Sequence, residues 1–514
     1  MATELRSRRA PARQCGPLAA GIAAGLLAGA PLVAGAAQAQ APADASWVRF
    51  RSDPARRLFA QLPAPRASAA GARPAATLVV TNCADDGDGS LRAAIAAAGE
   101  GDTIDLGRLS CARITLATGA IPVMLDELTI TGPGADALAI DGGGVDRVFL
   151  HYGGGTFTLR ALTVSGGRNR TSGFDVAGGG CIASAGYVNL DQAAVRDCYA
   201  GGEGAYGGAI YAFSLTAYES TLSGNTAYGV HAAAGTAAFG GAAFVYTTQL
   251  LHSTVSGNVA AHLDVEGRTS YDIGGGLISV LGGLLISSTV DSNYSEGRGG
   301  GIATFNDFAL YNSTVSGNVA ATSGGGGLFL RRPAGLSATS STIAANHAAT
   351  GGGVWSNSES LTLESSIVAD NFAAAGAADL QDDMPATVAG SNDLIGAASA
   401  TVVPPPDTLY ANPRLAPLAY NGGPTRTHAL LPDSPAIDAG NNVAALPYDQ
   451  RGAEFARIYG AAPDIGAFER QAAPTAAAPV PVPTLASKAL AVLAAAFAFV
   501  AWRERRRRLP RAVR

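Results

Sequence analysis

A six-residue motif that ends in asparagine recurs along the middle of the chain, and it constrains the fold more than any other feature. The copies are STLSGN (220–225), STVSGN (253–258), STVDSN (288–293), STVSGN (313–318), STIAAN (341–346) and SIVADN (366–371). Their final residues are separated by 33, 35, 25, 28 and 25 positions. A repeat of this length, sustained over many copies, is typical of solenoids in which each copy forms one coil.

Glycine clusters and short alternating runs lie between these copies. The clusters are GGGCI (178–182), GGAI (207–210), GGAAF (240–244), GGGLI (274–278), GGGIA (299–303), GGGLF (325–329) and GGGVW (351–355). Glycine permits a positive φ and a close approach of backbones at a corner, and short apolar–polar alternation indicates strands with one buried face. A period near 25 residues then gives three short strands and three corners per coil.

We therefore predict an all-β chain that folds as a right-handed parallel β-helix of roughly a dozen coils. A β-sandwich, the structural alternative, has no long fixed repeat. The motif asparagines should stack in a ladder along one edge, because asparagine tolerates left-handed backbone and its amide can bond the next copy. The longer spacings predict outward loops at 227–240 and 260–273. The ladder residues are Asn225, Asn258, Asn293, Asn318, Asn346 and Asn371.

The N-terminal residues predict export. Four arginines precede an apolar run that begins at Gly16, and Ala37-Gln38-Ala39 has the small residues that a signal peptidase recognises. We predict a signal peptide over 1–39 and a linker rich in proline, alanine and arginine over 40–76. An N-terminal membrane anchor is the alternative.

A second apolar run lies near the C-terminus. Residues 485–502 form a stretch of 18 residues, near the lower limit for a membrane-spanning helix, and a basic tail follows at 503–514. The arginine cluster predicts a cytoplasmic tail with the body on the other side of the membrane. An alanine- and proline-rich linker at 471–484 joins the two parts. We expect an extracellular or surface-bound protein, anchored at least transiently by this helix.

Two parts of the sequence resemble bacterial surface β-helix proteins of the choice-of-anchor type. The opening GSLRAAI (89–95) with GDTI (101–104), and the series NGGPTRTH (421–428) with SPAIDAG (434–440), carry this resemblance. It implies a pectin-lyase-like fold with an N-terminal cap at 77–110, coils over 111–391, and a last coil with a C-terminal cap at 392–470. Within the last block, Asp449 and Arg451 should form a polar pair.

A separate motif, Pro483-Thr484-Leu485, stands at the start of the apolar run. It resembles the VPTL/IPTL class of C-terminal sorting signals. The resemblance implies processing by an exosortase-type enzyme as well as contact with the export machinery. A permanent tail anchor is the alternative.

The body of the chain is acidic. Between Thr77 and Arg470 there are 17 arginines, no lysine, and 36 aspartates and glutamates, a net charge of −19. Binding to phosphates requires basic side chains, so we expect no nucleic-acid partner.

Four cysteines remain after removal of the signal peptide, and they allow three pairings. Pairing of close neighbours is the simplest arrangement in an oxidising compartment. It would join Cys83 to Cys111 and Cys181 to Cys198. A metal site is disfavoured, because no CxxC motif occurs and no histidine lies near these cysteines.

Residues 85–89, DDGDG, have the start of a calcium loop. The chain enters a predicted helix at Leu91 before the acidic twelfth position of such a loop is reached. We therefore favour a solvated turn with Ser90 as the N-cap of a helix over 91–98, and we expect no cofactor, with calcium bound at this turn as the alternative.

Two functions remain. The first is a surface-displayed protein with a structural, adhesive or glycan-binding role, in which exposed tyrosines stack on sugars. The alternative is an extracellular polysaccharide lyase or glycoside hydrolase, which needs positioned carboxylates. The absence of an ordered catalytic series and the acidic body favour the non-enzymatic function. The tyrosines are Tyr206, Tyr211, Tyr218, Tyr246 and Tyr271, and the acids of the enzyme alternative are Asp175, Asp264, Asp272 and Asp307.

Overall fold

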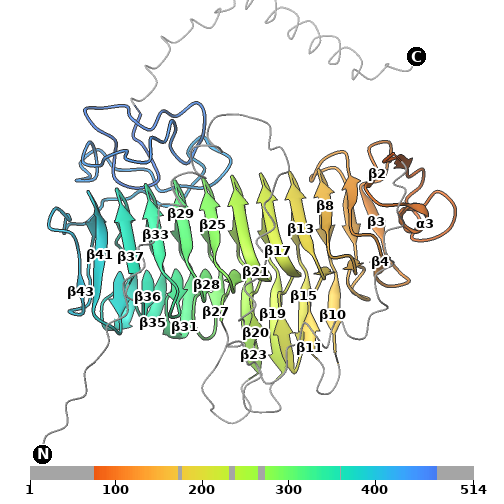
Figure 1. Cartoon of the computed structure of the whole chain (residues 1–514), viewed down its shortest axis with the longest axis horizontal. Helices are drawn as coiled ribbons and strands as arrows, with labels where there is room; N and C mark the ends of the chain where they lie inside the picture. Colours follow the sequence, from red (N-terminus) through yellow and green to blue (C-terminus); the bar gives the residue numbers. More distant parts are fainter. Residues whose placement is uncertain (1–73, 172–175, 231–237, 264–272, 359, 472–514) are drawn as a thin grey trace, which may run out of the picture. The chain divides into compact units, whose positions relative to one another are not determined.

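Short parallel strands wind around one long axis, so that each coil lies directly on the one before it (Figure 1). The computed structural model describes residues 74–171, 176–230, 238–263, 273–358 and 360–471. Every strand pair of its sheets is parallel, and the chain forms a right-handed parallel β-helix. The coils give one strand each to an 11-stranded sheet, close to the number that the repeat predicts.

The signal peptide, most of the linker that follows it, the sorting motif Pro483-Thr484-Leu485 and the C-terminal apolar run lie outside the described residues. Within the described ranges, no helix is both long enough and apolar enough to cross a bilayer.

The largest sheet, sheet A, has 21 strands among the described residues. Most coils cross it as two short strands separated by a bend, whereas β17 and β21 run through the bend as nine residues each. The strands are β1 (Thr77–Val79), β2 (Asp102–Asp105), β4 (Ile121–Val123), β5 (Leu128–Thr131), β7 (Phe149–His151), β8 (Thr156–Arg160), β12 (Ile182–Ser184), β13 (Tyr187–Asp191), β17 (Ile210–Tyr218), β21 (Ala243–Leu251), β24 (Leu277–Ser279), β25 (Gly283–Ile286), β28 (Ile302–Thr304), β29 (Phe308–Tyr311), β32 (Leu328–Leu330), β33 (Leu336–Thr339), β36 (Val354–Ser356), β37 (Ser360–Glu364), β40 (Leu380–Asp382), β41 (Ala386–Ser391) and β43 (Val402–Val403).

Sheet B follows sheet A in each coil and contains the first half of the asparagine motif. Its strands are β3 (Arg113–Thr115), β6 (Ala139–Asp141), β9 (Thr163–Ser165), β14 (Ala194–Arg196), β18 (Thr221–Ser223), β22 (Thr254–Ser256), β26 (Thr289–Asp291), β30 (Thr314–Ser316), β34 (Thr342–Ala344), β38 (Ile367–Val368) and β42 (Leu394–Ile395).

Sheet C completes the coil, and a small sheet D pairs beside it in three coils of the described chain. Sheet C contains β10 (Arg168–Arg170), β15 (Tyr199–Gly202), β19 (Thr226–Val230), β23 (Val259–Leu263), β27 (Tyr294–Ser295), β31 (Val319–Gly324), β35 (His347–Thr350) and β39 (Phe372–Ala375). Sheet D contains β11 (Val176–Gly178), β16 (Gly204–Tyr206) and β20 (Ala238–Phe239).

The core fills the inside of the coils. The middle residue of each three-residue strand of sheet B points inward, and Val195, Leu222 and Val255 are fully buried on successive rungs. Aliphatic side chains of sheets A and B stack on one another along the axis, so one continuous hydrophobic core runs from Val80 to Val402. Burial of this apolar surface is the main favourable contribution to folding.

The glycine clusters form the corner between sheets C and A. Gly207 has φ +67°, and a Cβ there would lie 1.9 Å from the carbonyl oxygen of Ile210. A Cβ on Gly208 would lie 2.1 Å from the carbonyl oxygen of Gly241 in the next coil. Only glycine therefore fits where the backbones of successive coils meet.

The corner between sheets A and B is closed differently. From β9 onward, each sheet B strand is preceded by one residue with positive φ that is not glycine: Ala161, Gln192, Glu219, His252, Ser287, Asn312, Ser340, Ser365 and Asn392. The glycine pattern of the sequence does not mark this corner, because other residues adopt positive φ there at a modest conformational cost, whether the side chain is exposed, as in Gln192, or buried, as in Ser365.

Sheet D and the parts of β15, β19 and β23 that face it project from the body as a lateral blade (Figure 1). Its interior is packed by small side chains, Ala205, Ala227, Ala238 and Ala260. The sequence predicted outward loops at 227–240 and 260–273. The strands β19 and β23 instead continue into these segments as far as Val230 and Leu263.

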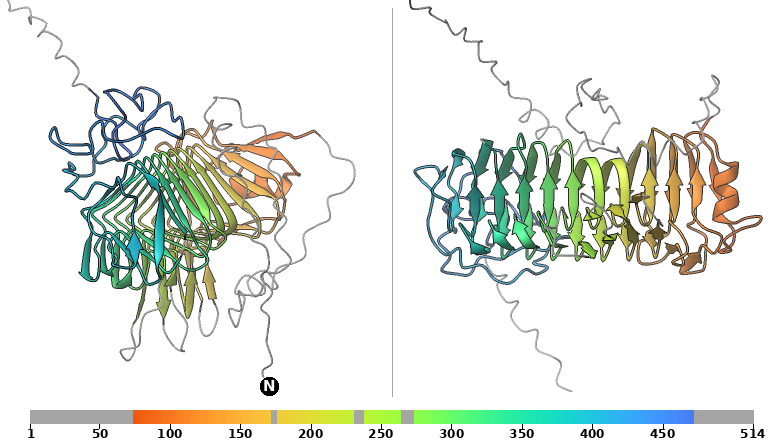
Figure 2. Two further views of the ribbon diagram at one scale, coloured as in Figure 1. Left: turned by 60° about the vertical axis from the view of Figure 1, so that its left-hand side comes forward. Right: turned by 90° about the horizontal axis from the view of Figure 1, so that it is seen from below.

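A short helix covers the first coil, at the end opposite to β43 (Figure 2). The helix α3 (Leu91–Ala97) begins at the N-cap Ser90, whose hydroxyl accepts from the backbone of Ala93 at 3.2 Å. Leu91 and Ile95 are buried against the end of the core. The helix thus protects an edge that would otherwise expose unpaired apolar strands.

Residues 404–470, the C-terminal block, contain isolated bridges and no strand among the 43 numbered ones. The sequence predicted a cap on the last coil. The block instead lies along the outer face of sheet B, where it contacts several coils (Figure 1). The amide of Gln450 bonds Thr289 at 2.9 Å and Thr314 at 2.6 Å, on neighbouring coils.

The block has its own polar centre. Arg451 pairs with Asp449 at 2.6 Å, as the sequence predicts, and its guanidinium lies 3.8 Å and 3.9 Å from the ring centres of Phe455 and Phe468. The fully buried Arg457 lies 3.8 Å from a carboxylate oxygen of Glu469.

Candidate functional site

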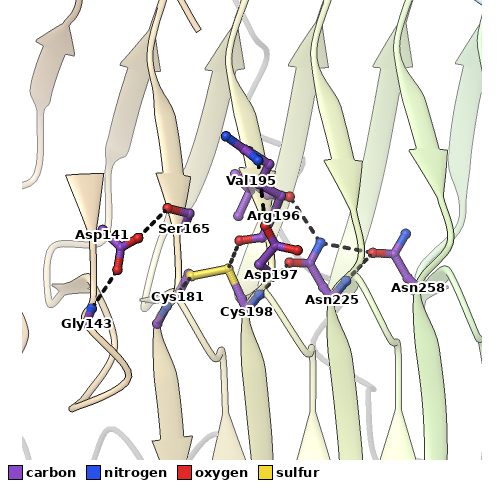
Figure 3. Close-up of a disulfide and its surroundings, with 11 residues drawn as sticks. Asp141, Gly143, Ser165, Cys181, Val195, Arg196, Asp197, Cys198, Asn225 and Asn258 are labelled. Atoms are coloured by element: carbon purple, nitrogen blue, oxygen red, sulfur yellow. Dashed lines mark hydrogen bonds and ion pairs between the residues drawn. A yellow bond between two sulfur atoms is a disulfide. The ribbon is translucent and has the colours of Figure 1, made fainter. Parts of the chain in front are cut away.

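Two disulfides brace the N-terminal half. Cys83 bonds Cys111 and clips the cap to the first coil, and Cys181 bonds Cys198 across the inside of one coil. Cys198 occupies the position that asparagine takes in the coils that follow, and its N–H donates to Asn225 Oδ1 at 3.1 Å (Figure 3). Both bridges join sequence neighbours, 28 and 17 residues apart.

The six motif asparagines form one continuous ladder from that disulfide toward the C-terminal end. From Asn258 onward, each Oδ1 accepts two bonds from the rung before it, one from the backbone N–H at 3.0 Å and one from the side-chain Nδ2 at 2.8–2.9 Å. Each Nδ2 also donates to a backbone carbonyl of the preceding coil, as Asn225 does to Val195 at 3.1 Å (Figure 3). The first five of these asparagines are fully buried. Their role is therefore structural.

An aspartate ends this ladder. Asp379 Oδ1 accepts from the backbone N–H and from the Nδ2 of Asn371, both at 2.9 Å. The last rung has to accept hydrogen bonds but not to donate them, which suits a carboxyl. Burial raises the pKa of Asp379, and the bonds from Asn371 oppose that shift.

A second ladder, of serines, runs along the other edge of sheet B. Each Oγ accepts from the backbone N–H of the preceding rung at 3.0–3.2 Å and donates to the carbonyl two residues earlier. The sequence prediction did not include this ladder, although the same motif marks it: its first residue is always serine. An aspartate also ends this second ladder: Asp393 Oδ1 accepts from the backbone N–H of Ser366 at 2.9 Å. Burial raises the pKa of Asp393 to about 8. The rungs are Ser220, Ser253, Ser288, Ser313, Ser341 and Ser366.

A serine–histidine pair is buried beneath the C-terminal block. His428 lies between the C-terminal block and sheet B, where its Nε2 is 2.8 Å from Ser316 Oγ and its Nδ1 is 2.7 Å from the carbonyl oxygen of Ala416. Burial lowers the pKa of His428. Both side chains of the serine–histidine pair are at least nine-tenths buried, so a substrate does not reach it.

Asp291 is also sealed beneath the C-terminal block, where it pairs with Arg426. Burial raises the pKa of Asp291, and the Arg426 guanidinium opposes the shift. This pair links the block to the coils.

The acidic residues at the N-terminal end bind backbone amides. Asp85 accepts from Arg92 and Thr118, both at 2.7 Å, and these bonds hold its pKa at about 2. The exposed Glu100 accepts from the N–H groups of Asp126 and Glu127. Across the part of the chain that the structure describes, no group of three or more acidic, histidine or cysteine side chains is arranged to hold a metal ion.

Of the four acids of the enzyme alternative, only Asp307 lies among the described residues. Asp307 is exposed on the turn before β29 and accepts from the N–H of Gly335 at 2.9 Å. Asp175, Asp264 and Asp272 lie outside the described residues.

A chain of aromatic rings crosses the outer face of sheet A and forms the candidate binding face. Tyr187 is 41% exposed and meets Phe213 edge-on at 5.6 Å. Phe213 stacks on Tyr246 at 5.3 Å, and Tyr246 contacts Phe244 at 6.5 Å. The chain continues toward the lateral blade through Tyr211 and Phe239, which are buried, and Tyr206, which is half-buried. We call these seven rings the aromatic array.

The two ends of the array differ in exposure. Toward the blade it belongs to a small second core outside the coils, packed with Ile273 and Ile278. Burial there raises the pKa of Tyr206 to about 12. Toward sheet A the rings of Tyr187, Phe213 and Tyr246 reach the surface.

The tyrosines that the sequence suggested for sugar stacking therefore have different positions. Tyr211 is buried, Tyr206 and Tyr246 are half-buried, and Tyr218 is exposed at the corner next to His252. Tyr271 lies outside the described residues. Tyr187 and Phe213, which complete the exposed end of the array, were missed because nothing in their spacing links them to Tyr246.

Uncharged polar side chains border the exposed end of the array. Thr158, Asn189, Thr216 and Gln249 lie side by side on four successive strands, one row along from Tyr187. We call these four residues the polar row. Within the described part of the chain, neither Asn189 nor Gln249 is joined to another residue by a side-chain hydrogen bond, and Gln249 is exposed. The array and the row together offer stacking surface and hydrogen-bonding groups on one rigid sheet.

The sequence matches no family model, and a search of curated proteins finds no similar sequence. A search of solved structures finds the crystal structure of pectate lyase Pel9A, with 14% identity and a TM-score of 0.39. The alignment covers 77% of this chain and 98% of the lyase chain.

Proposed function

We propose that this chain is an exported β-helix protein displayed at the cell surface, where it serves as a rigid adhesive scaffold that binds glycans. The observation that carries the proposal is the aromatic array, whose exposed rings stand beside the polar row on sheet A of a solenoid whose coils are joined by two buried ladders. Aromatic faces bordered by hydrogen-bonding side chains suit sugars, which have apolar ring faces and a hydroxyl rim. A rigid site also loses little conformational freedom when it binds.

Export is supported by the two disulfides, because disulfides persist in oxidising compartments. The basic and apolar N-terminal run supports it too. We further propose that residues 485–502 hold the C-terminus in the membrane, and that Pro483-Thr484-Leu485 is the site at which an exosortase-type enzyme acts.

The test of display is surface proteolysis of intact cells, followed by detection of the body with an antibody. The body should be lost from intact cells while a cytoplasmic marker survives. Loss of about 30 residues from the C-terminus of the mature chain, seen by mass spectrometry, would favour sorting over a permanent anchor. A full-length chain recovered from the cytoplasm would refute the proposal.

The test of binding includes the enzyme alternative. The purified chain is incubated with neutral and acidic polysaccharides, with and without calcium, and new reducing ends and unsaturated products are measured. We expect retention of the protein by a polysaccharide without cleavage. Sustained cleavage would replace the scaffold with a lyase or hydrolase.

A further inference from the structure

We infer that the exposed end of the aromatic array and the polar row form one binding site for an uncharged polysaccharide chain, which lies along the solenoid axis. This inference rests on the proposed function and names its ligand. It assigns contact roles to Tyr187, Asn189 and Gln249.

The direction of the ligand follows from the strand register. Thr156, Tyr187, Ser214 and Thr247 occupy one row across four strands, and the polar row is the next row on the same face, because residues two apart along a strand point the same way. Both rows run along the axis of the solenoid. A linear polymer placed along the rows meets a polar group at each coil, whereas one laid along a single strand meets only one or two.

The class of ligand follows from charge. The eight side chains of the two rows include no charged group. Arg160 and Asp191, at the C-terminal ends of β8 and β13, form an ion pair with each other at 2.7 Å. The two charges of this pair therefore neutralise each other. A polyanion would also approach a body with a net charge of −19 and would be repelled. Hydroxyl groups, in contrast, suit amide side chains that both donate and accept.

The site is held rigid by the buried core beneath sheet A and by contacts between neighbouring side chains. Val188 and Leu190 alternate with the row residues along β13 and are buried in the core. The hydroxyl of Thr247 donates to Ser214 at 2.8 Å and ties two neighbouring strands within the first row. Phe213 supports the ring of Tyr187 from the side. Binding therefore requires ordering of the ligand rather than of the protein.

The experiment is affinity electrophoresis of the full-length chain, solubilised in a mild detergent, in native gels that contain galactomannan, hydroxyethylcellulose or polygalacturonate. We expect retardation by a neutral polymer that persists at high salt, since no ion pair contributes. Tyr187→Ala should weaken it about tenfold, as expected for a central aromatic contact. The double variant Asn189→Ala with Gln249→Ala should weaken it as well, and Tyr187→Phe should retain most of it.

The matched control is Tyr294→Ala. Tyr294 is 36% exposed on sheet C, away from the array, and its loss should leave retardation unchanged. Thermal unfolding of each variant shows whether the fold is intact. If Tyr187→Ala unfolds, the polar-row double variant still tests the site, because its two side chains lie outside the core.

The outcomes separate the ligand class from the function. Retardation by polygalacturonate alone, abolished by salt, would overturn the neutral ligand and leave glycan binding in place. Equal weakening by Tyr294→Ala would overturn the location. A chain that is displayed at the surface but retarded by none of the polymers would overturn this inference and leave only display, whereas failure of display defeats the proposed function itself.

Discussion

Replacement of one internal rung of the asparagine ladder by aspartate should destabilise the protein strongly, and more so at higher pH. Asn318 is fully buried, and its Nδ2 donates to Val290 O at 2.9 Å, Ser316 O at 3.2 Å and Asn346 Oδ1 at 2.9 Å. An aspartate keeps the shape and the acceptor of Asn318 but loses this donor. A carboxylate would then face three acceptor oxygens in a buried site.

The magnitude follows from these contacts. The two N–H groups of Nδ2 serve these three acceptors, and their loss amounts to about 2 kcal/mol, to which the burial of unpaired charge adds. Protonation of the new carboxyl relieves part of the cost, so its pKa in the folded protein should be raised. The folded state then binds more protons than the unfolded state, and the deficit in stability should grow as pH rises from about 4 toward 8.

The reciprocal variant at the end of the ladder is the control. Asp379→Asn keeps the acceptor for Asn371 and removes a buried carboxyl whose pKa burial raises. Because the folded state holds the proton of Asp379 more tightly than the unfolded state, the wild-type protein loses stability as pH rises. Asp379→Asn should therefore leave the free energy of unfolding unchanged at acid pH and raise it near pH 8.

The assay is urea unfolding of both variants at several pH values, followed by far-ultraviolet circular dichroism. The midpoints should move in opposite directions at alkaline pH. An Asn318→Asp protein with the wild-type midpoint at pH 8 would falsify the argument, since it would show that the side-chain ladder adds nothing to the stacking of the coils.

Three further changes test other parts of the coil. Ser340 has φ +46° and a buried hydroxyl without a partner in the described chain, so Ser340→Gly should raise the free energy of unfolding by about 1 kcal/mol; a lower thermal midpoint would contradict this. Asp393→Ser should continue the serine ladder and stabilise the protein mainly above neutral pH, because the raised pKa of Asp393, about 8, makes the wild type less stable as pH rises from about 4 to 8; a difference independent of pH in the same urea assay would argue against it. Gly207→Ala should lower the free energy of unfolding by more than about 2 kcal/mol. The control Gly154→Ala has open space around the added Cβ and should change it by less than about 0.5 kcal/mol. Equal effects of the two variants on the unfolding midpoint would disprove the steric explanation of the corner.

The repeat by itself determines the coil. The hexad gives the period, the strand–corner alternation and the stacking of Asn225 on Asn258, because a side chain that recurs once per coil must meet its own copy in the next. The cap helix is equally local, since Ser90 and the apolar Leu91 and Ile95 suffice to place it. The serine ladder was within reach of the same reasoning, as Ser253 and Ser288 recur with the same period.

The candidate site depends on tertiary structure. Tyr187, Phe213 and Tyr246 meet because β13, β17 and β21 pair in one register, and loops of unequal length hide that register in the sequence. The same holds for Gln450, which binds Thr289 161 residues away along the outside of sheet B. Local periodicity specifies which residues share a face of one coil. Which outer side chains are covered, and by which distant segment, is decided only when the long-range packing of the blade and the C-terminal block excludes water from some faces and leaves others exposed.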